Sequence, residues 1–228
     1  MALPMSEQQF HFTKPVILVG GGKASTTVID ACRQYAPHII AADGGADWLD
    51  QNGYPIDGVI GDFDSLTSPD IWKQRLGTNA VEMPDQNSSD FDKCLSLIKA
   101  PVVLAIGFLG ERFDHALYAL QAMCLSDQPV IMLDNDNCVC ALNDQSTAFA
   151  FEPGSRVSIM PVRETYCEKS RGLEWPVAGH TLAPDGLRSL SNMVVESPLQ
   201  LKMHRKGAVL MAGYEHLDVL YQSAVSRL

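Results

Sequence analysis

Acidic side chains recur where short apolar runs of the sequence end or where a helical pattern begins. They are Asp43 in "ADGGA", Asp62 and Asp64 in "GDFDS", Asp90 in "PDQNSSDF" and Asp114 in "GERFDH". Oxygen ligands without nearby His or Cys favour magnesium or manganese over zinc. Magnesium also keeps water and substrate phosphates as ligands, so the pattern indicates a metal site with a polyphosphate partner.

The pair in "GVIGDFDSL" is the densest of these groups. Strand geometry sends Asp62 and Asp64, two positions apart, to one side and Phe63 to the other, into apolar packing. Carboxylates that face one point raise one another's pKa unless a cation lies among them. A single pair of this kind is usually surface charge, and Asp43 or Asp90 alone would suit a turn or a helix start. Their recurrence at successive junctions favours a shared site.

The elements that must position these carboxylates lie between Pro15 and Asn143, where short apolar runs alternate with amphipathic segments. This pattern is typical of βα units around a mostly parallel, Rossmann-like sheet. We expect strands at 15–21, 38–42, 57–62, 80–83, 102–109, 129–133 and 138–142, and helices at 24–36, 47–53, 69–77, 88–100 and 112–126. The last helix should bury Phe113, Leu117, Leu120 and Cys124. In an open α/β sheet, ligands bind outside the carboxyl ends of the strands, where the acidic residues would meet.

The pattern changes after about residue 146, because helical periodicity gives way to short alternating runs separated by Pro, Gly, Asn and Ser. Runs at 156–162, 192–197, 199–203 and 208–213 predict a small all-β domain, a sandwich. We therefore expect an α/β domain over residues 1–145 and a β-sandwich domain over residues 146–228. Residues 214–228 suit either a short helix or a tail.

Composition excludes several classes of protein. The formal charge of −10, with only 17 Lys and Arg residues, argues against general nucleic-acid binding. No apolar run approaches the roughly 20 residues of a membrane span, and the N-terminus lacks a signal-peptide core. The six cysteines form no CxxC pair, so buried free thiols in a reducing compartment are expected. These features predict a cytoplasmic protein without a membrane or nucleic-acid partner.

The four acidic motifs, in this order and spacing, resemble those of the thiamine pyrophosphokinase family, and "SRGLEW" and "SLSN" resemble its C-terminal domain. The likeness extends from about Val16 to Gly213. It implies an α/β catalytic domain that uses Mg²⁺ and ATP as co-substrate, followed by a thiamine-binding sandwich. It also implies a homodimer, with thiamine in a cleft between the catalytic domain of one subunit and the sandwich of the other.

The resemblance also assigns roles to individual residues. The magnesium and catalytic carboxylates are Asp43, Asp62, Asp64, Asp90 and Asp114, with the metal on the first three. Gln86, Arg112 and Asp90 become nucleotide contacts, and Ser191 and Asn192 become thiamine contacts. Trp175 is expected to be buried in the sandwich core, with stacking near the thiamine pyrimidine as the alternative. The sequence leaves open whether Asp90 or Asp114 accepts the hydroxyl proton.

Two positions depart from the family pattern. Asn87 begins the segment "NSSD" where family members commonly have Asp-His-Thr-Asp, and Glu111 replaces a glycine before Arg112. The first change removes a carboxylate near the nucleotide, and the second adds an anion near the phosphates. We expect both changes to affect affinity rather than the type of reaction.

The implied reaction is attack of the thiamine hydroxyl on the β-phosphorus of ATP, which gives thiamine diphosphate and AMP. One rival is a magnesium-dependent phosphatase, because "VIGDFDSLT" also resembles the haloacid-dehalogenase motif in which Asp62 would be the nucleophile and Asp64 the acid. That family places the motif on its first strand, whereas two βα units precede it here. A second rival is a thiamine- or nucleotide-binding protein without catalytic activity.

Overall fold

The structure is a computed structural model that describes residues 10–85, 87–110 and 112–226 of the 228-residue chain. The chain has a mixed α/β fold and divides into two compact units, residues 1–119 and residues 120–228. The division falls within helix α5 (Phe113–Leu125). The domain boundary that the sequence predicts near residue 145 stays a prediction.

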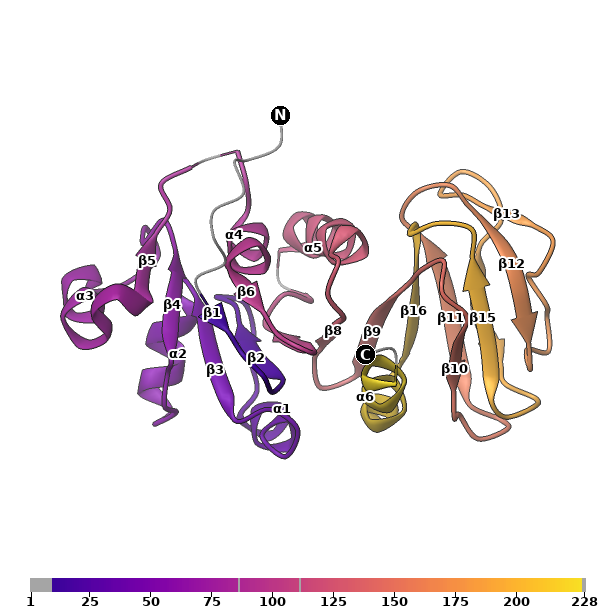
Figure 1. Cartoon of the computed structure of the whole chain (residues 1–228), viewed down its shortest axis with the longest axis horizontal. Coiled ribbons are helices and arrows are strands. Elements are labelled where there is room, and N and C mark those ends of the chain that lie inside the picture. The colour runs from indigo at the N-terminus through magenta and orange to yellow at the C-terminus, as the bar shows by residue number, and fades with distance from the viewer. Residues whose placement is uncertain (1–9, 86, 111, 227–228) are drawn as a thin grey trace. The chain divides into compact units, whose positions relative to one another are not determined.

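The first unit contains a run of five short strands that pair in parallel, in the order β7-β2-β3-β4-β5, of which Figure 1 labels β2, β3, β4 and β5. They are β2 (Val16–Val19), β3 (His38–Ala42), β4 (Gly58–Gly61), β5 (Ala80–Glu82) and β7 (Val103–Ile106). Every residue of β2, β4 and β7 is buried. Continuous apolar runs therefore form these strands because both faces of a parallel sheet are covered.

The helices of this unit differ from the expected ranges, because most are shorter and the second is as long as expected but begins two residues earlier. They are α1 (Thr26–Cys32), α2 (Gly45–Gln51), α3 (Pro69–Leu76), the 3₁₀ turn η1 (Gly77–Asn79) and α4 (Asp90–Leu97). A capping box begins α4, in which Asp92 N donates to Ser89 Oγ over 3.2 Å. The predicted extension of this helix to residue 100 is wrong, because Ile98 turns to extended backbone. Strand β6 (Ile98–Lys99) then pairs with β1 (Phe10–His11).

The predicted apolar face of α5 is also wrong in part. Phe113 is 73% exposed and Leu117 is 46% exposed, whereas the helix buries Ala116, Ala119 and Met123. These three lie at i, i+3 and i+7, so the helix packs through a face made mainly of small side chains. Of the predicted face, Cys124 is buried as expected.

The second unit contains two antiparallel arrangements of strands. The first has the order β8-β9-β16-β11-β14, made of β8 (Val130–Leu133), β9 (Asn137–Leu142), β16 (Ala208–Gly213), β11 (Arg156–Pro161) and β14 (Ser189–Met193). The second has the order β10-β15-β12-β13, made of β10 (Thr147–Phe149), β15 (Leu199–Met203), β12 (Thr165–Arg171) and β13 (Thr181–Leu182). The sequence pattern did not indicate β10, β12 or β13.

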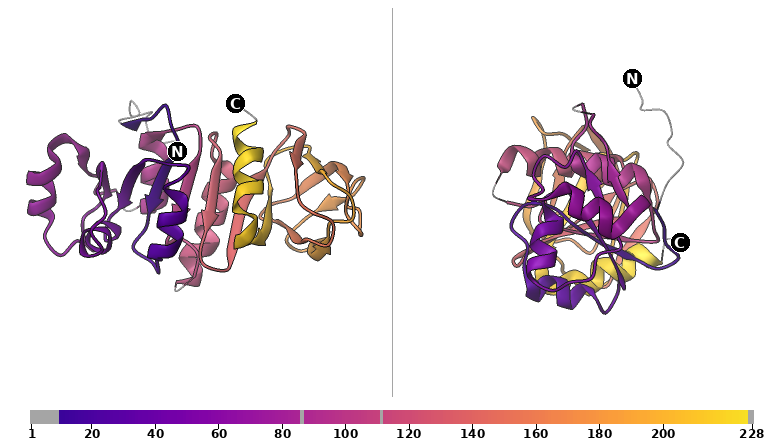
Figure 2. Two further views of the ribbon diagram at one scale, coloured as in Figure 1. Left: turned by 90° about the horizontal axis from the view of Figure 1, so that it is seen from below. Right: turned by 90° about the vertical axis from the view of Figure 1, so that its left-hand side faces the viewer.

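The end of the chain forms the turn η2 (Tyr214–His216) and the helix α6 (Leu217–Val225), which resolves the choice between helix and tail in favour of the helix. Helix α6 packs on β9 and β10, as Figure 2 shows in yellow beside the strands of this unit. Phe149 and Phe151 are fully buried, and Phe151 meets the ring of His216 edge to face. Aromatic packing therefore joins the turn η2 to the segment that follows β10.

All six cysteines are free and buried, as the sequence predicts. Burial raises the pKa of the Cys32 thiol to about 12, so this group stays protonated and unreactive at neutral pH. Among the helices of the described residues, none combines the length and the hydropathy that crossing a membrane requires.

Candidate active site

Asp43 is the buried centre of the acidic cluster. It follows β3 directly, adopts a left-handed backbone (φ 44°) and is only 3% exposed. Its Oδ2 accepts a hydrogen bond from Ser65 N over 3.1 Å. Its Oδ1 is buried without a hydrogen-bond partner in the described part of the chain. A buried carboxylate oxygen that lacks a donor is a free ligand position for a cation.

The pKa of Asp43 is raised, first by burial and further by the nearby charges of Asp90 and Asp62. Hydrogen bonds from Ser65 lower it in part. The protein therefore keeps this carboxylate in an environment that disfavours its charge, as expected for a site that a divalent cation completes.

Asp62 and Asp64 join Asp43 in one group, because ligand oxygens of the three side chains all lie within 4.8 Å of one another. The convergence that the sequence predicts is confirmed for these three residues, but its cause differs. Strand β4 ends at Gly61, and Phe63 adopts a left-handed backbone with φ 65°. A turn, rather than strand alternation, therefore directs the two carboxylates to one side while Phe63 is 4% exposed.

Asp90 is connected to Asp62 of this group by Lys93, a residue that sequence reasoning missed. Lys93 on α4 is 1% exposed, and its Nζ donates to Asp62 Oδ2 over 3.3 Å and to Asp90 Oδ1 over 3.1 Å. Burial alone would lower the pKa of this ammonium, but the contacts with Asp90 and then Asp62 outweigh burial and raise it. The only signal in the sequence was a lysine three residues after Asp90, within the expected helix.

Asp114 lies apart from the group formed by Asp43, Asp62 and Asp64. It is in the first turn of α5, where Arg112 Nη2 contacts its Oδ2 over 2.7 Å, and both side chains are about two thirds exposed at 68% and 65%. The hydrogen bond from Arg112 is the main cause that lowers the pKa of Asp114. Gln86, the predicted nucleotide contact, lies outside the described residues, as does Glu111, which departs from the family pattern.

The segment that departs from the family pattern is organised around Asp85. Asn87 donates to Asp85 Oδ1 from its backbone N over 3.1 Å and from its Nδ2 over 2.9 Å. Ser88 Oγ donates to Asp85 Oδ2 over 3.0 Å. These bonds, first that of the Asn87 backbone, lower the pKa of Asp85. Asn87 therefore stabilises the turn that precedes α4.

The residues predicted on the thiamine side lie in the second unit. Asn192 is 1% exposed and holds the Trp175 backbone from both ends of its amide, because its Nδ2 donates to Trp175 O over 2.7 Å and its Oδ1 accepts from Trp175 N over 3.2 Å. Ser191 has φ 51°, and its N donates to Ser158 Oγ over 3.0 Å. The expected burial of Trp175 is wrong, because its side chain is 59% exposed.

Trp175 and Asn192 line an open cavity of about 340 Å³, together with His180, Leu187 and Arg188. Asn192 fixes the main chain from which the exposed indole projects. An exposed aromatic ring beside polar groups suits a flat heteroaromatic ligand.

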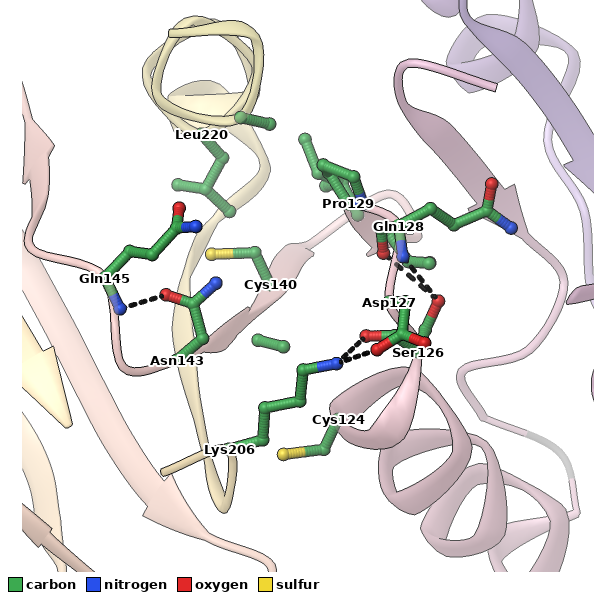
Figure 3. Close-up of a pocket in the computed structure, with 14 residues that line it drawn as sticks. Cys124, Ser126, Asp127, Gln128, Pro129, Cys140, Asn143, Gln145, Lys206 and Leu220 are labelled. Carbon is green, nitrogen blue, oxygen red and sulfur yellow. Dashed lines mark hydrogen bonds and ion pairs between the residues drawn. The ribbon is translucent and has the colours of Figure 1, made fainter. Parts of the chain in front are cut away.

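A second cavity of about 160 Å³ lies in the same unit and contains none of the predicted site residues (Figure 3). The side chain of Lys206 extends across this cavity, and its Nζ donates to Ser126 O over 2.7 Å and to Asp127 Oδ1 over 2.6 Å. The lysine therefore satisfies groups beyond the end of α5, which is a structural role.

The parallel strands and the carboxylates gathered where β3 and β4 end define a class of α/β proteins with an acidic site at the carboxyl edge of the sheet. Residues 30–133 match the family description "Thiamin pyrophosphokinase, catalytic domain", and residues 146–205 match "Thiamin pyrophosphokinase, vitamin B1 binding domain". Together these two matches span most of the chain. The protein belongs to the thiamin pyrophosphokinase family.

Individual relatives agree with this assignment. Thiamine pyrophosphokinase 2 of Arabidopsis thaliana is 26% identical over 72% of this chain and 73% of its own. Thiamine pyrophosphokinase 1 of the same plant is 27% identical over 67% of this chain, and the match spans 63% of that relative, less than two thirds of its length.

Solved structures show the same fold. The yeast thiamin pyrophosphokinase has a TM-score of 0.72 at 16% identity, with 92% of this chain and 93% of that chain covered. The thiamine pyrophosphokinase of Bacillus subtilis has a TM-score of 0.71 at 19% identity, with 88% and 98% covered.

Proposed function

We propose that this chain transfers the terminal diphosphoryl group of ATP to the hydroxyl of thiamine and so produces thiamine diphosphate and AMP. The single observation that supports this most strongly is the group formed by Asp43, Asp62 and Asp64, which lies within residues 30–133 that match the family's catalytic domain. The hydroxyl oxygen forms a bond to the β-phosphorus while the bond from that phosphorus to the bridging α–β oxygen breaks. AMP leaves with that oxygen, and the hydroxyl proton passes to a carboxylate.

The residues at this site fit a magnesium ion. The donors are carboxylate oxygens, one from each of the three residues, and they lie within 4.8 Å of one another. Asp43 Oδ1 is also buried without a partner among the described residues. When bound, the ion would neutralise charge on the transferred phosphates and on the leaving oxygen. Asp43, Asp62 and Asp64 would hold it.

The remaining polar residues of the first unit would orient the nucleotide and remove the proton. Arg112 is exposed and has the planar guanidinium that suits phosphate, and Gln86 is the second proposed nucleotide contact. The proton acceptor would be Asp90 or Asp114. Asp90 accepts a hydrogen bond from the buried Lys93, whereas Asp114 accepts one from the exposed Arg112.

Thiamine would bind in the second unit beside Trp175. The exposed indole would stack on the pyrimidine ring, with Asn192 holding its backbone and Ser191 contacting the ligand. We further infer that the first unit is a Rossmann-like domain and the second a thiamine-binding β-sandwich, with the boundary near residue 145. The proposed assembly is a cytoplasmic homodimer in which one subunit's α/β domain faces the other's sandwich.

The phosphatase alternative requires Asp62 as a nucleophile. The Oδ2 of this residue accepts a hydrogen bond from the buried Lys93, and Asp62 follows β4, the third of the parallel strands in chain order. Both features favour a metal-ligand role over nucleophilic attack. The non-catalytic alternative rests on the altered segment at Asn87, but Asn87 donates two hydrogen bonds to Asp85.

One experiment separates the three functions. The purified chain would be incubated with ATP, Mg²⁺ and thiamine, and AMP and thiamine diphosphate would be measured by chromatography. We expect equal amounts of the two products and none without Mg²⁺. A covalent fluoroberyllate or phosphoryl adduct on Asp62 would instead support the phosphatase, and binding of both substrates without product would support the binding protein.

A further inference from the structure

Lys93 is the one cationic side chain that is buried among the described residues of this protein. It comes from α4, whereas its partner Asp62 follows β4, 31 positions earlier in the chain. Burying an ammonium is costly unless hydrogen-bonded anions surround it. The buried ammonium at the edge of the acidic site therefore carries a desolvation free energy that an apolar side chain at the same position of α4 would avoid.

Lys93 contacts two carboxylates, of which only one belongs to the group that can hold a metal ion. Asp62 belongs to the group of three that can hold a metal ion, whereas Asp90 does not. A carboxylate has two oxygens, each able to accept more than one bond, so Asp62 can receive the ammonium on Oδ2 and still present an oxygen to an ion. Asp90 receives the same ammonium on Oδ1, over 3.1 Å. One buried group thus sets the orientation of both side chains.

We propose that Lys93 is a positioning residue that fixes Asp62 as a metal ligand and aligns Asp90 beside it. This inference rests on the proposed function, because it assigns Asp62 to the metal site of that reaction. Partners behind metal ligands orient them and tune their affinity in the same way in other proteins. The contacts of Lys93 with these two carboxylates are the route by which we expect it to affect the reaction.

The direction in which metal affinity changes when Lys93 is removed tests the inference. Loss of positioning predicts weaker binding, whereas charge repulsion alone predicts tighter binding. A cation next to a metal ligand repels the metal, so its removal would strengthen binding if charge were its whole effect. If Lys93 positions Asp62, its removal weakens binding. We expect Lys93→Met to bind Mn²⁺ about tenfold more weakly than the native protein. Lys93→Gln removes the same charge but keeps a donor, and it should retain part of the affinity.

The measurement is a titration of the purified full chain with Mn²⁺, in which electron paramagnetic resonance reports the free ion without any nucleotide. Lys206→Met is the matched control, because it removes another carboxylate-paired lysine that makes no contact with Asp62 or Asp90. The control should bind Mn²⁺ as the native protein does. Melting temperatures in EDTA and in Mg²⁺ should show a smaller Mg²⁺ stabilisation for Lys93→Met than for the control.

Unchanged or tighter Mn²⁺ binding by folded Lys93→Met protein would overturn the inference. If the variants do not fold, the native protein provides the test through NMR of its ¹⁵N-labelled lysine ammonium groups. One ammonium signal should be protected from solvent exchange, and Mg²⁺ should shift it; a protected signal that Mg²⁺ leaves in place would refute the positioning role. Native protein that binds Mn²⁺ but forms no AMP would refute the proposed reaction while leaving this inference intact.

Discussion

Gly61 makes room for Asp43. A β-carbon added at Gly61 would lie 2.7 Å from the β-carbon of Asp43, closer than non-bonded carbons approach. Asp43 N also donates to Ile60 O over 2.9 Å, so the backbone of the acidic residue is joined to the strand that ends at Gly61. The absence of a side chain at one position therefore permits the burial of a carboxylate at another.

Gly61→Ala should displace Asp43 and weaken the metal site. Overpacking of this kind costs roughly 1 to 3 kcal/mol, so we expect a lower free energy of unfolding and weaker Mn²⁺ binding. Gly21→Ala is the control, because the nearest atom to its added β-carbon is 3.9 Å away. Urea denaturation and Mn²⁺ titration would measure both effects, and native-like values for Gly61→Ala would contradict the close packing of these two residues.

Asp62→Asn should abolish AMP formation while the chain stays folded. The change keeps the shape of the side chain but removes the charge that would hold the metal and pair with Lys93. Asp70→Asn, at an exposed position in the first turn of α3, should keep full activity. Product formation by the Asp62→Asn protein at the native rate, with matching circular dichroism spectra, would contradict a metal role for Asp62.

Much of the acidic site could be predicted because strand ends in a parallel sheet meet at one edge. Asp43, Asp62 and Asp64 converge for this reason, and apolar runs locate the strands that position them. Lys93 could not be predicted, since a lysine on an amphipathic helix is usually at the surface and only the folded chain shows the carboxylates that receive it. The turn at Phe63 was likewise hidden, because a left-handed backbone at a bulky residue has no local signal.

The faces of α5 and the position of Trp175 show why burial is harder to predict than element type. A period of 3.6 identifies the helix, but its small residues Ala116 and Ala119 pack inward and Phe113 does not. If the buried face of a helix is chosen by side-chain size alone, the choice is therefore wrong where neighbouring elements pack closely against small residues. Trp175 is exposed, and its backbone is held by Asn192 in a tertiary contact between residues 17 positions apart, which no local pattern indicates.

Phe63→Ala should destabilise the protein by about 3 kcal/mol or more, because the ring is almost fully buried and its loss leaves a cavity. The side chain of Lys73 also lies over this ring, with Nζ 5.6 Å from the centroid. Phe113→Ala provides the comparison, since that ring is 73% exposed and its removal should change stability little. Thermal unfolding of both variants measures the difference, and equal melting temperatures would contradict the packing described for Phe63.

The raised pKa of Asp43 predicts a pH dependence of stability in the absence of divalent metal. Between the usual pKa of an aspartate and its raised value, the folded chain binds more protons at this group than the unfolded chain does. The contribution of Asp43 to the free energy of unfolding is therefore greatest at low pH and falls as pH rises through that interval. Urea denaturation in EDTA should show this fall as a difference between native protein and Asp43→Asn.

Excess Mg²⁺ should reduce this difference near neutral pH, because the ion would stabilise the ionised carboxylate only in the folded state. The same pH profile for native protein and Asp43→Asn in EDTA would show that burial of Asp43 does not disfavour its charge.

Trp175→Ala should weaken thiamine binding and leave the fold intact. The indole is 59% exposed, so its removal leaves no cavity, whereas stacking on an aromatic ring contributes roughly 0.5 to 1.5 kcal/mol beyond the buried area. We expect a higher KM for thiamine, an unchanged KM for ATP and a native melting temperature. Trp175→Phe should recover part of the affinity, because a phenyl ring keeps a flat apolar face.

Tyr166→Ala is the matched control, since Tyr166 is an aromatic residue of β12 in the same unit with a similar exposure of 44%. Its KM for thiamine should equal that of the native protein. If both alanine variants raised this KM equally, the effect would be a general one of the exposed strands. A rise confined to Trp175→Ala and reversed in part by phenylalanine would come from the ring itself, on the backbone that Asn192 holds.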